Sequence, residues 1–88
     1  MDKNIAKALK QKAHHLKPVI IVGQKSLSDS VMNEINVALD HHELIKIRVN
    51  ADDRGQRNQM IQEICRKTGS ELIQRVGHIA AVYRESVK

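Results

Sequence analysis

The sequence predicts an α+β fold in which three helices pack against a four-stranded mixed sheet. Two observations support this class: three segments repeat apolar residues at helical spacing, and four short runs are β-branched or alternate in polarity. They follow one another in the order α-β-α-β-α-β-β. We expect one domain, residues 1–88, as either a two-layer or a three-layer sandwich. Strands joined through a helix should be parallel and the last two antiparallel.

The first segment predicts a helix from about residue 3 to 15 with two distinct sides. Its apolar side comprises Ile5, Leu9, Ala13 and Leu16. Its cationic side comprises Lys3, Lys7, Lys10 and His14. Pro18 ends this helix, because a proline pushes the residue before it out of the α region.

The next elements are a strand, a polar loop and a second helix. Residues 19–22 are short and β-branched without alternation, which predicts a strand covered on both faces. The loop 23–26 follows, and a helix is expected from about 28 to 41. Either Ser26 or Ser28 can cap the start of that helix.

The second half of the chain predicts a strand, a helix and a hairpin. Residues 44–49 alternate, with Leu44, Lys46 and Arg48 on the polar face of a strand that buries its other face. A helix should begin at Asp52 or Asp53 and end at Gly69. Two strands, 71–76 and 79–84, are joined by a tight turn.

The charge is concentrated at one end. Residues 1–27 hold six lysines and one aspartate, whereas residues 28–88 hold nine basic and nine acidic residues. The whole net charge of +5 therefore lies in the first third. This asymmetry predicts an anionic partner, nucleic acid before a membrane surface, although a basic helix exterior that is only solvated gives the same pattern.

Composition narrows the function. Tyr83 is the only aromatic residue besides histidine, so stacking of bases on several rings is excluded and phosphate contacts are expected instead. Cys65 lies on the apolar side of its helix, and we find no metal-ligand spacing, nucleophile or cofactor fingerprint. We therefore expect no enzyme, cofactor or metal. The single cysteine and the lack of a long apolar run favour the cytoplasm and no membrane contact.

The loop between the first strand and the second helix is the candidate site. A strand that leads through Gly23 into a helix N-terminus can present backbone N–H groups to a phosphate, and Lys25 adds a mobile charge. Lys17 and the lysines of the first helix are expected nearby. Arg54 and Arg57 either pair with Asp52 or Asp53 or form a second anion contact, and Lys46 and Arg48 are expected to be solvated.

Three stretches resemble one known family. They are "HHLKPVIIVGQKSLSDSVMNEINVALDHHELIKIRV", "TGSELIQRVG" and "AAVYR". The chain is similar to the YhbY-type CRM domain, the chloroplast RNA splicing and ribosome maturation module, over nearly its whole length.

The resemblance implies a fold like the C-terminal domain of a bacterial translation initiation factor. It also implies RNA binding through a loop like the G-x-x-G loop of KH domains, with stand-alone bacterial members associated with precursors of the large ribosomal subunit. That loop corresponds to Gly23, Gln24, Lys25 and Ser26, so serine stands in place of the second glycine.

We therefore expect a monomeric protein that binds RNA, with ribosomal RNA of large-subunit precursors as its partner. The expected contact face comprises Lys7, Lys10, Lys17, Gly23, Gln24, Lys25, Ser26, Arg54, Arg57 and Arg84. The alternative is a protein-interaction module that docks its basic helix on an acidic partner.

Overall fold

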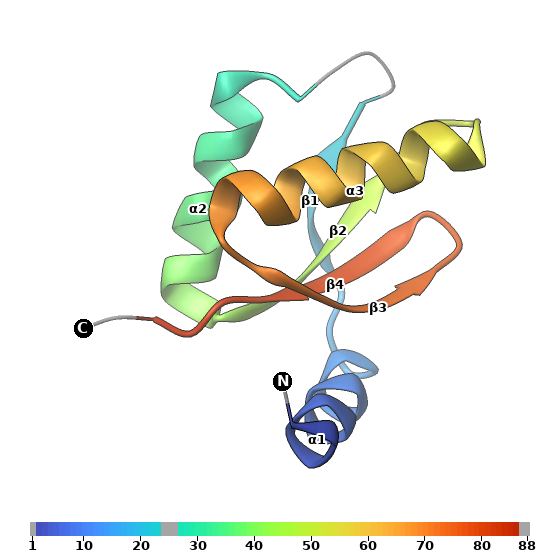
Figure 1. Cartoon of the computed structure of the whole chain (residues 1–88). Coiled ribbons are helices and arrows are strands. Elements are labelled where there is room, and N and C mark those ends of the chain that lie inside the picture. The colour runs from blue at the N-terminus through green and yellow to red at the C-terminus, as the bar shows by residue number, and fades with distance from the viewer. Residues whose placement is uncertain (1, 24–26, 87–88) are drawn as a thin grey trace.

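The computed structural model describes residues 2–23 and 27–86, and its elements follow the predicted order (Figure 1). They are α1 (Lys3–Ala13), β1 (Pro18–Val22), α2 (Asp29–His42), β2 (Leu44–Val49), α3 (Arg54–Thr68), β3 (Glu71–Val76) and β4 (Ile79–Tyr83). The α+β prediction is confirmed. The first helix ends at Ala13, two residues earlier than expected, and a tight turn closes on it through the N–H of Leu16 and the carbonyl oxygen of Ala13, 3.0 Å apart.

The four strands form one mixed sheet in the order β1-β2-β4-β3. β1 and β2 are parallel neighbours, and β3 and β4 are antiparallel neighbours, as predicted. β4 also pairs antiparallel with β2, so it lies between β2 and β3. The two strands joined through α3 therefore run in the same direction without pairing.

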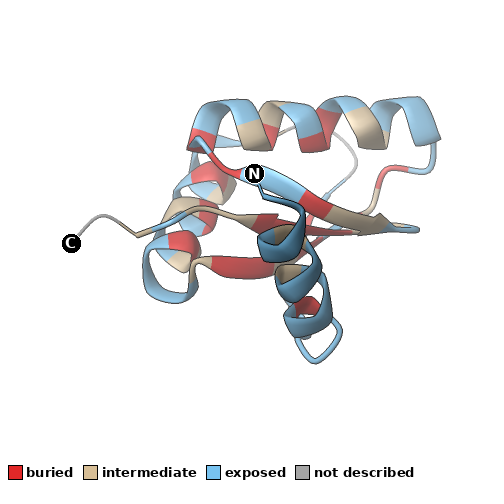
Figure 2. Ribbon diagram, turned by 60° about the horizontal axis from the view of Figure 1, so that its bottom comes forward, coloured by how far each residue is buried: buried red, intermediate tan, exposed pale blue. Residues whose placement is uncertain are grey.

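The helices lie on both sides of the sheet, which makes the fold three-layered. α2 and α3 cover one face, and α1 packs on the other (Figures 1 and 2). The main core lies under α2 and α3 and includes Ile35, Ile47 and Val82, each with no measurable exposure. Complete burial of one such side chain contributes about 1.5–3 kcal/mol. A smaller cluster under α1 contains Ala13, Leu44, Ile73 and Ala81.

The second face of the sheet differs from the prediction at β1 and at Leu44. β1 was expected to be covered on both faces, but Val19 and Ile21 are 56% and 64% exposed. The prediction was wrong because β1 is an edge strand, and α1 contacts β2 and β3 instead. β-branched residues favour strands whether or not a layer covers them. Leu44, expected on the polar face, is buried under α1.

Side-chain caps fix where the helices begin. Ser28, rather than Ser26, caps α2 by accepting a 3.2 Å hydrogen bond from the N–H of Val31. Asp53 caps α3 by accepting from the N–H of Gln56 at 3.2 Å. Gly69 ends α3 with a left-handed φ of 70°, a conformation that glycine adopts without steric cost.

A candidate nucleic-acid interface

The carboxyl ends of β1 and β2 meet at one edge of the sheet. The N–H of Asn50 donates a 2.9 Å hydrogen bond to the carbonyl oxygen of Val22, which places Gly23 beside the segment that leads into α3. α2 and α3 both begin on this side of the molecule (Figure 1). Helix N-termini carry partial positive charge and unpaired N–H groups, so this edge suits an anion.

Gly23 leaves open space at this edge. A Cβ atom added to it would meet no atom of the described residues within 4 Å. The glycines with a positive φ are Gly69 and Gly77, so within the described chain Gly23 does not need the left-handed conformation. What the glycine offers is room for close approach to the backbone. The predicted contacts Gln24, Lys25 and Ser26 lie outside the described residues.

The two arginines at the start of α3 differ in their surroundings. Arg54 is exposed on the first turn. Arg57 is half-buried, and its Nη1 lies 3.0 Å from the carbonyl oxygens of both Ala51 and Asp52. The same Nη1 lies 3.2 Å from Nε2 of His78, so Arg57 joins α3 to the β3–β4 turn. This geometry favours a structural part for Arg57 and leaves Arg54 accessible to a ligand.

The lysines of α1 lie at the other end of β1. The sequence predicted that Lys17 and the lysines of α1 would be near the Gly23 loop, and this was wrong. α1 precedes β1 whereas Gly23 follows it, and a five-residue strand extends about 16 Å (Figure 1). The prediction relied on closeness along the chain, but the extended strand β1 separates residues that are near one another in sequence. Lys7, Lys10 and Lys17 are all exposed.

Lys46 and Arg48 of β2 lie between the Gly23 loop and α1, and the sequence predicted only that both are solvated. Arg48 pairs in register with the exposed Ile21, and Lys46 lies two residues earlier on the same face. The Arg48 Nε donates a 2.9 Å hydrogen bond to Oδ1 of Asn50. The alternation of β2 already placed both cations on one face. The alternation could not show that α1 leaves the sheet surface around Arg48 uncovered.

Arg84 is held within the fold. Its Nη1 donates to Oδ1 of Asn36 at 2.8 Å and to the carbonyl oxygen of Thr68 at 2.7 Å. Its Nη2 donates to the carbonyl oxygen of Asn36 at 3.1 Å and forms a 2.8 Å ion pair with Asp40. The side chain is 22% exposed. Arg84 therefore ties the end of β4 to α2 and to the end of α3.

Two features of the described residues concern metal binding and the reactivity of Cys65. No group of three or more His, Cys, Asp or Glu side chains among them could hold a metal ion. Burial raises the pKa of the half-buried Cys65 thiol, and a hydrogen bond involving Ser70 opposes this only in part. A raised pKa disfavours the nucleophilic thiolate. In the described part of the chain no helix has the length and apolar character needed to span a membrane.

Comparison with known proteins identifies the family. Residues 1–84 match the CRS1 / YhbY (CRM) domain, and the chain belongs to this family. A Pseudomonas aeruginosa protein named as a probable RNA-binding protein is 40% identical over 82 residues, which cover 93% of this chain and 79% of that protein. A Haemophilus influenzae protein named as an RNA-binding protein is 45% identical over 78 residues, covering 89% and 79%.

A solved structure shows the same fold. The solution structure of a Staphylococcus aureus protein matches with a TM-score of 0.86 at 25% identity, covering 100% of this chain and 92% of that one. The family resemblance and the predicted fold are thus confirmed. The names of both bacterial relatives describe RNA binding and no enzymatic activity.

Proposed function

We propose that this protein binds RNA through phosphate contacts along a surface that we call the basic strip. The described members of the strip are Lys7, Lys10, Lys17, Gly23, Arg48 and Arg54. The sequence adds Gln24, Lys25 and Ser26 of the loop. Arg57 and Arg84 were in the predicted contact face, but their guanidinium groups already bind the protein, so the strip omits them.

The observation that carries the proposal is the uncompensated charge of the strip. The ion pairs of the described residues join Glu63 to Arg66 and Lys67, and Asp40 to Arg84. None of these pairs involves Lys7, Lys10, Lys17, Arg48 or Arg54, the described cations of the strip. Unpaired lysine and arginine side chains on an exposed surface can neutralise phosphates and release counterions, which drives binding to nucleic acid.

Two further features support a backbone mode of binding. The chain has no Phe or Trp, and its single Tyr83 lies against the small cluster under α1, so the stacking platforms of other RNA-binding modules are missing. The open space at Gly23 lets an RNA phosphate approach the main chain. Affinity should therefore depend strongly on salt and weakly on base sequence.

The family resemblance suggests ribosomal RNA of large-subunit precursors as the partner, which would place the protein in the cytoplasm. Ultraviolet crosslinking in cells followed by sequencing of the bound RNA tests this directly. We expect enrichment of large-subunit ribosomal RNA over small-subunit RNA, and a variant with Lys7, Lys10 and Arg54 changed to Ala should lose it. Equal recovery of both ribosomal RNAs would contradict the proposed partner.

The alternative of an acidic protein partner predicts a different competition result. If the basic helix is built to dock on an acidic protein, such a protein should displace labelled RNA from the chain more readily than unlabelled RNA of equal charge does. We expect the reverse order, because phosphates can also use the Gly23 edge. Fluorescence anisotropy with labelled RNA and an acidic competitor protein distinguishes the two.

A further inference from the structure

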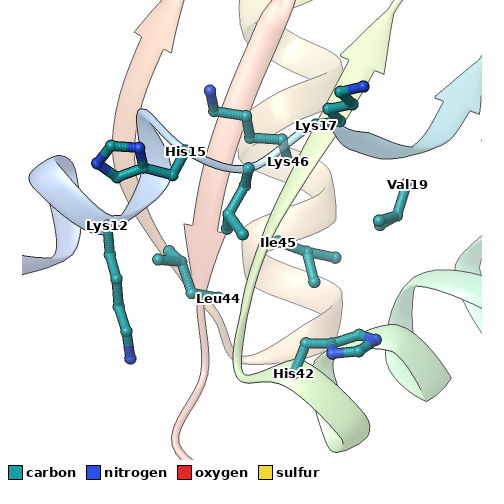
Figure 3. Close-up of a pocket in the computed structure, with 9 residues that line it drawn as sticks. Lys12, His15, Lys17, Val19, His42, Leu44, Ile45 and Lys46 are labelled. Carbon is teal, nitrogen blue, oxygen red and sulfur yellow. The ribbon is translucent and has the colours of Figure 1, made fainter.

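A pocket lies at the end of β1 that is remote from Gly23. It has a volume of about 370 Å³ and opens between the end of α1, the starts of β1 and β2 and the end of α2 (Figure 3). Its lining residues are Lys12, His15, Leu16, Lys17, Val19, His42, Leu44, Ile45 and Lys46. Known ligand pockets are of about 300–1,000 Å³, so this one has room for one small ligand.

The lining divides into a basic rim and an apolar floor. The side chains of Lys17 and Lys46 point to one side of the pocket and that of Lys12 to the other, with the imidazoles of His15 and His42 also on opposite sides (Figure 3). The floor is lined by the aliphatic residues Leu16, Val19, Leu44 and Ile45. Leu44 and Ile45 point to opposite sides of β2 and are buried, so Leu16 and Val19 supply its exposed apolar surface (Figure 3). No carboxylate lines the pocket. Among the described residues, none of the three ammonium groups forms an ion pair.

This combination selects the chemistry of the ligand. A cationic rim without acids complements a phosphate, because no carboxylate of the lining competes for the ammonium groups. An aliphatic floor favours a flat apolar group, and it gives nothing to inorganic phosphate. A nucleotide carries both parts, with a phosphate linked through a sugar to a planar base.

We propose that this pocket binds a single nucleoside monophosphate unit, with its phosphate at Lys17 and Lys46 and its base on the aliphatic floor. The unit is either an unpaired nucleotide of RNA or a free nucleotide. The RNA source rests on the proposed function, and the free nucleotide does not. The pocket gives the protein a way to prefer RNA with unpaired nucleotides, which the phosphate contacts of the basic strip cannot supply.

Titration of the ¹⁵N-labelled protein with adenosine monophosphate tests the pocket itself. We expect saturable amide shifts centred on residues 44–46. The affinity should exceed that for adenosine and for inorganic phosphate by about tenfold or more, because each of these lacks one part of the ligand. If adenosine monophosphate binds no more tightly than inorganic phosphate, the proposal is wrong.

A pair of variants on β1 shows whether the floor is responsible. Val19→Glu places a carboxylate on the floor and should weaken binding of adenosine monophosphate by about tenfold or more. Ile21→Glu adds the same charge to the same exposed face of β1 outside the pocket and should weaken it much less. Equal losses would overturn the proposal. If melting shows that Val19→Glu is unfolded, Leu16→Glu on the same floor takes its place, with the exposed Ile5→Glu on α1 outside the pocket as control.

RNA binding is measured in parallel with a duplex and with the same duplex carrying one unpaired nucleotide. The wild type should prefer the second RNA, and Val19→Glu should lose this preference while it still binds the duplex. Duplex binding without any preference would overturn the pocket proposal for RNA and leave the basic strip intact. Failure to bind either RNA would contradict the proposed function. The titration with adenosine monophosphate would still show whether the pocket binds a free nucleotide.

Discussion

The N–H of Asn50 donates a 2.9 Å hydrogen bond to the carbonyl oxygen of Val22, and this bond joins the carboxyl ends of β1 and β2 at one end of the candidate interface. One residue beyond Val22 is Gly23, and four residues beyond Asn50 is Arg54, the first residue of α3. Parallel pairing of β1 and β2 thus brings a glycine loop and an exposed arginine to the same edge. Gly23 and Arg54 are far apart in sequence, so the sequence alone does not reveal that they share this edge.

The first prediction separates Arg54 from Arg57. Arg54→Ala should weaken RNA binding and leave the melting temperature unchanged, because its side chain is exposed. Arg57→Ala should lower the free energy of unfolding by about 1.5–3 kcal/mol, since it removes the charged donor of two backbone carbonyls. RNA titration and urea unfolding of both variants measure these effects. Equal loss of affinity in two folded variants would place Arg57 in the interface.

The second prediction concerns Arg84. Arg84→Ala should lower the free energy of unfolding by about 1.5–3 kcal/mol because it leaves Asn36, Thr68 and Asp40 without their donor. Arg84→Lys should not restore it, since an ammonium group cannot reproduce the guanidinium fork. RNA affinity measured well below the melting temperature should be unchanged. A large loss of affinity would return Arg84 to the RNA contact face.

The third prediction tests the electrostatic part of the strip. Changing Lys7, Lys10 and Lys25 to Ala should weaken RNA binding and reduce the salt slope by up to about one unit for each lost phosphate contact. Stability should hardly change, because Lys7 and Lys10 are exposed. The control changes Arg66 and Lys67 to Ala at the end of α3, where both pair with Glu63, and the loss of affinity is compared per charge removed, three against two. If the control loses as much affinity, binding reflects net charge and no defined strip exists.

The fourth prediction concerns Cys65. Burial raises the pKa of its thiol, so the fold favours the protonated form. The stabilisation this provides is present below the ordinary thiol pKa and is lost as pH rises through the raised value. We expect a disulfide reagent to label the folded chain more slowly than the urea-unfolded chain at pH 8. Equal rates would show that the thiol is neither buried nor shifted.

Periodicity in the sequence was sufficient to predict the helices and strands and their order. Alternation in residues 44–49 and helical spacing around Ile61 and Ile64 reflect which faces are buried, and this is local information. The sequence could not show that β1 is an edge strand, because Val19 and Ile21 favour a strand with or without cover. It also could not show that β4 inserts between β2 and β3, because this depends on how the β3–β4 hairpin folds back onto β2.

The candidate site was less predictable for the same reason. Gly23, Lys7 and Arg54 were recognised from residue type and charge, but their separation depends on the direction of β1. Arg57 and Arg84 look like ligand contacts in sequence, and their carbonyl partners come from segments that no local pattern connects to them. Arg48 was predicted only to be solvated. That its surroundings are open to a ligand depends on where α1 packs, which the sequence does not show.

The loop provides a graded series that separates shape from charge. Gly23→Ala adds one carbon atom and Gly23→Val adds three, and the described structure leaves space for a Cβ without a positive φ, so both variants should fold. Ser26→Gly restores the family pattern and should hold or tighten RNA binding. It should carry no capping cost, because Ser28 caps α2.

The most direct test of the RNA-backbone account is the affinity of Gly23→Val for a large-subunit ribosomal RNA fragment at two salt concentrations, with thermal melting to verify folding. A folded Gly23→Val should lose loop-dependent binding at both salt concentrations although every lysine and arginine remains, and Gly23→Ala should be intermediate. If a folded Gly23→Val binds as tightly as the wild type, the loop is only a turn, and the cations act as a diffuse basic patch.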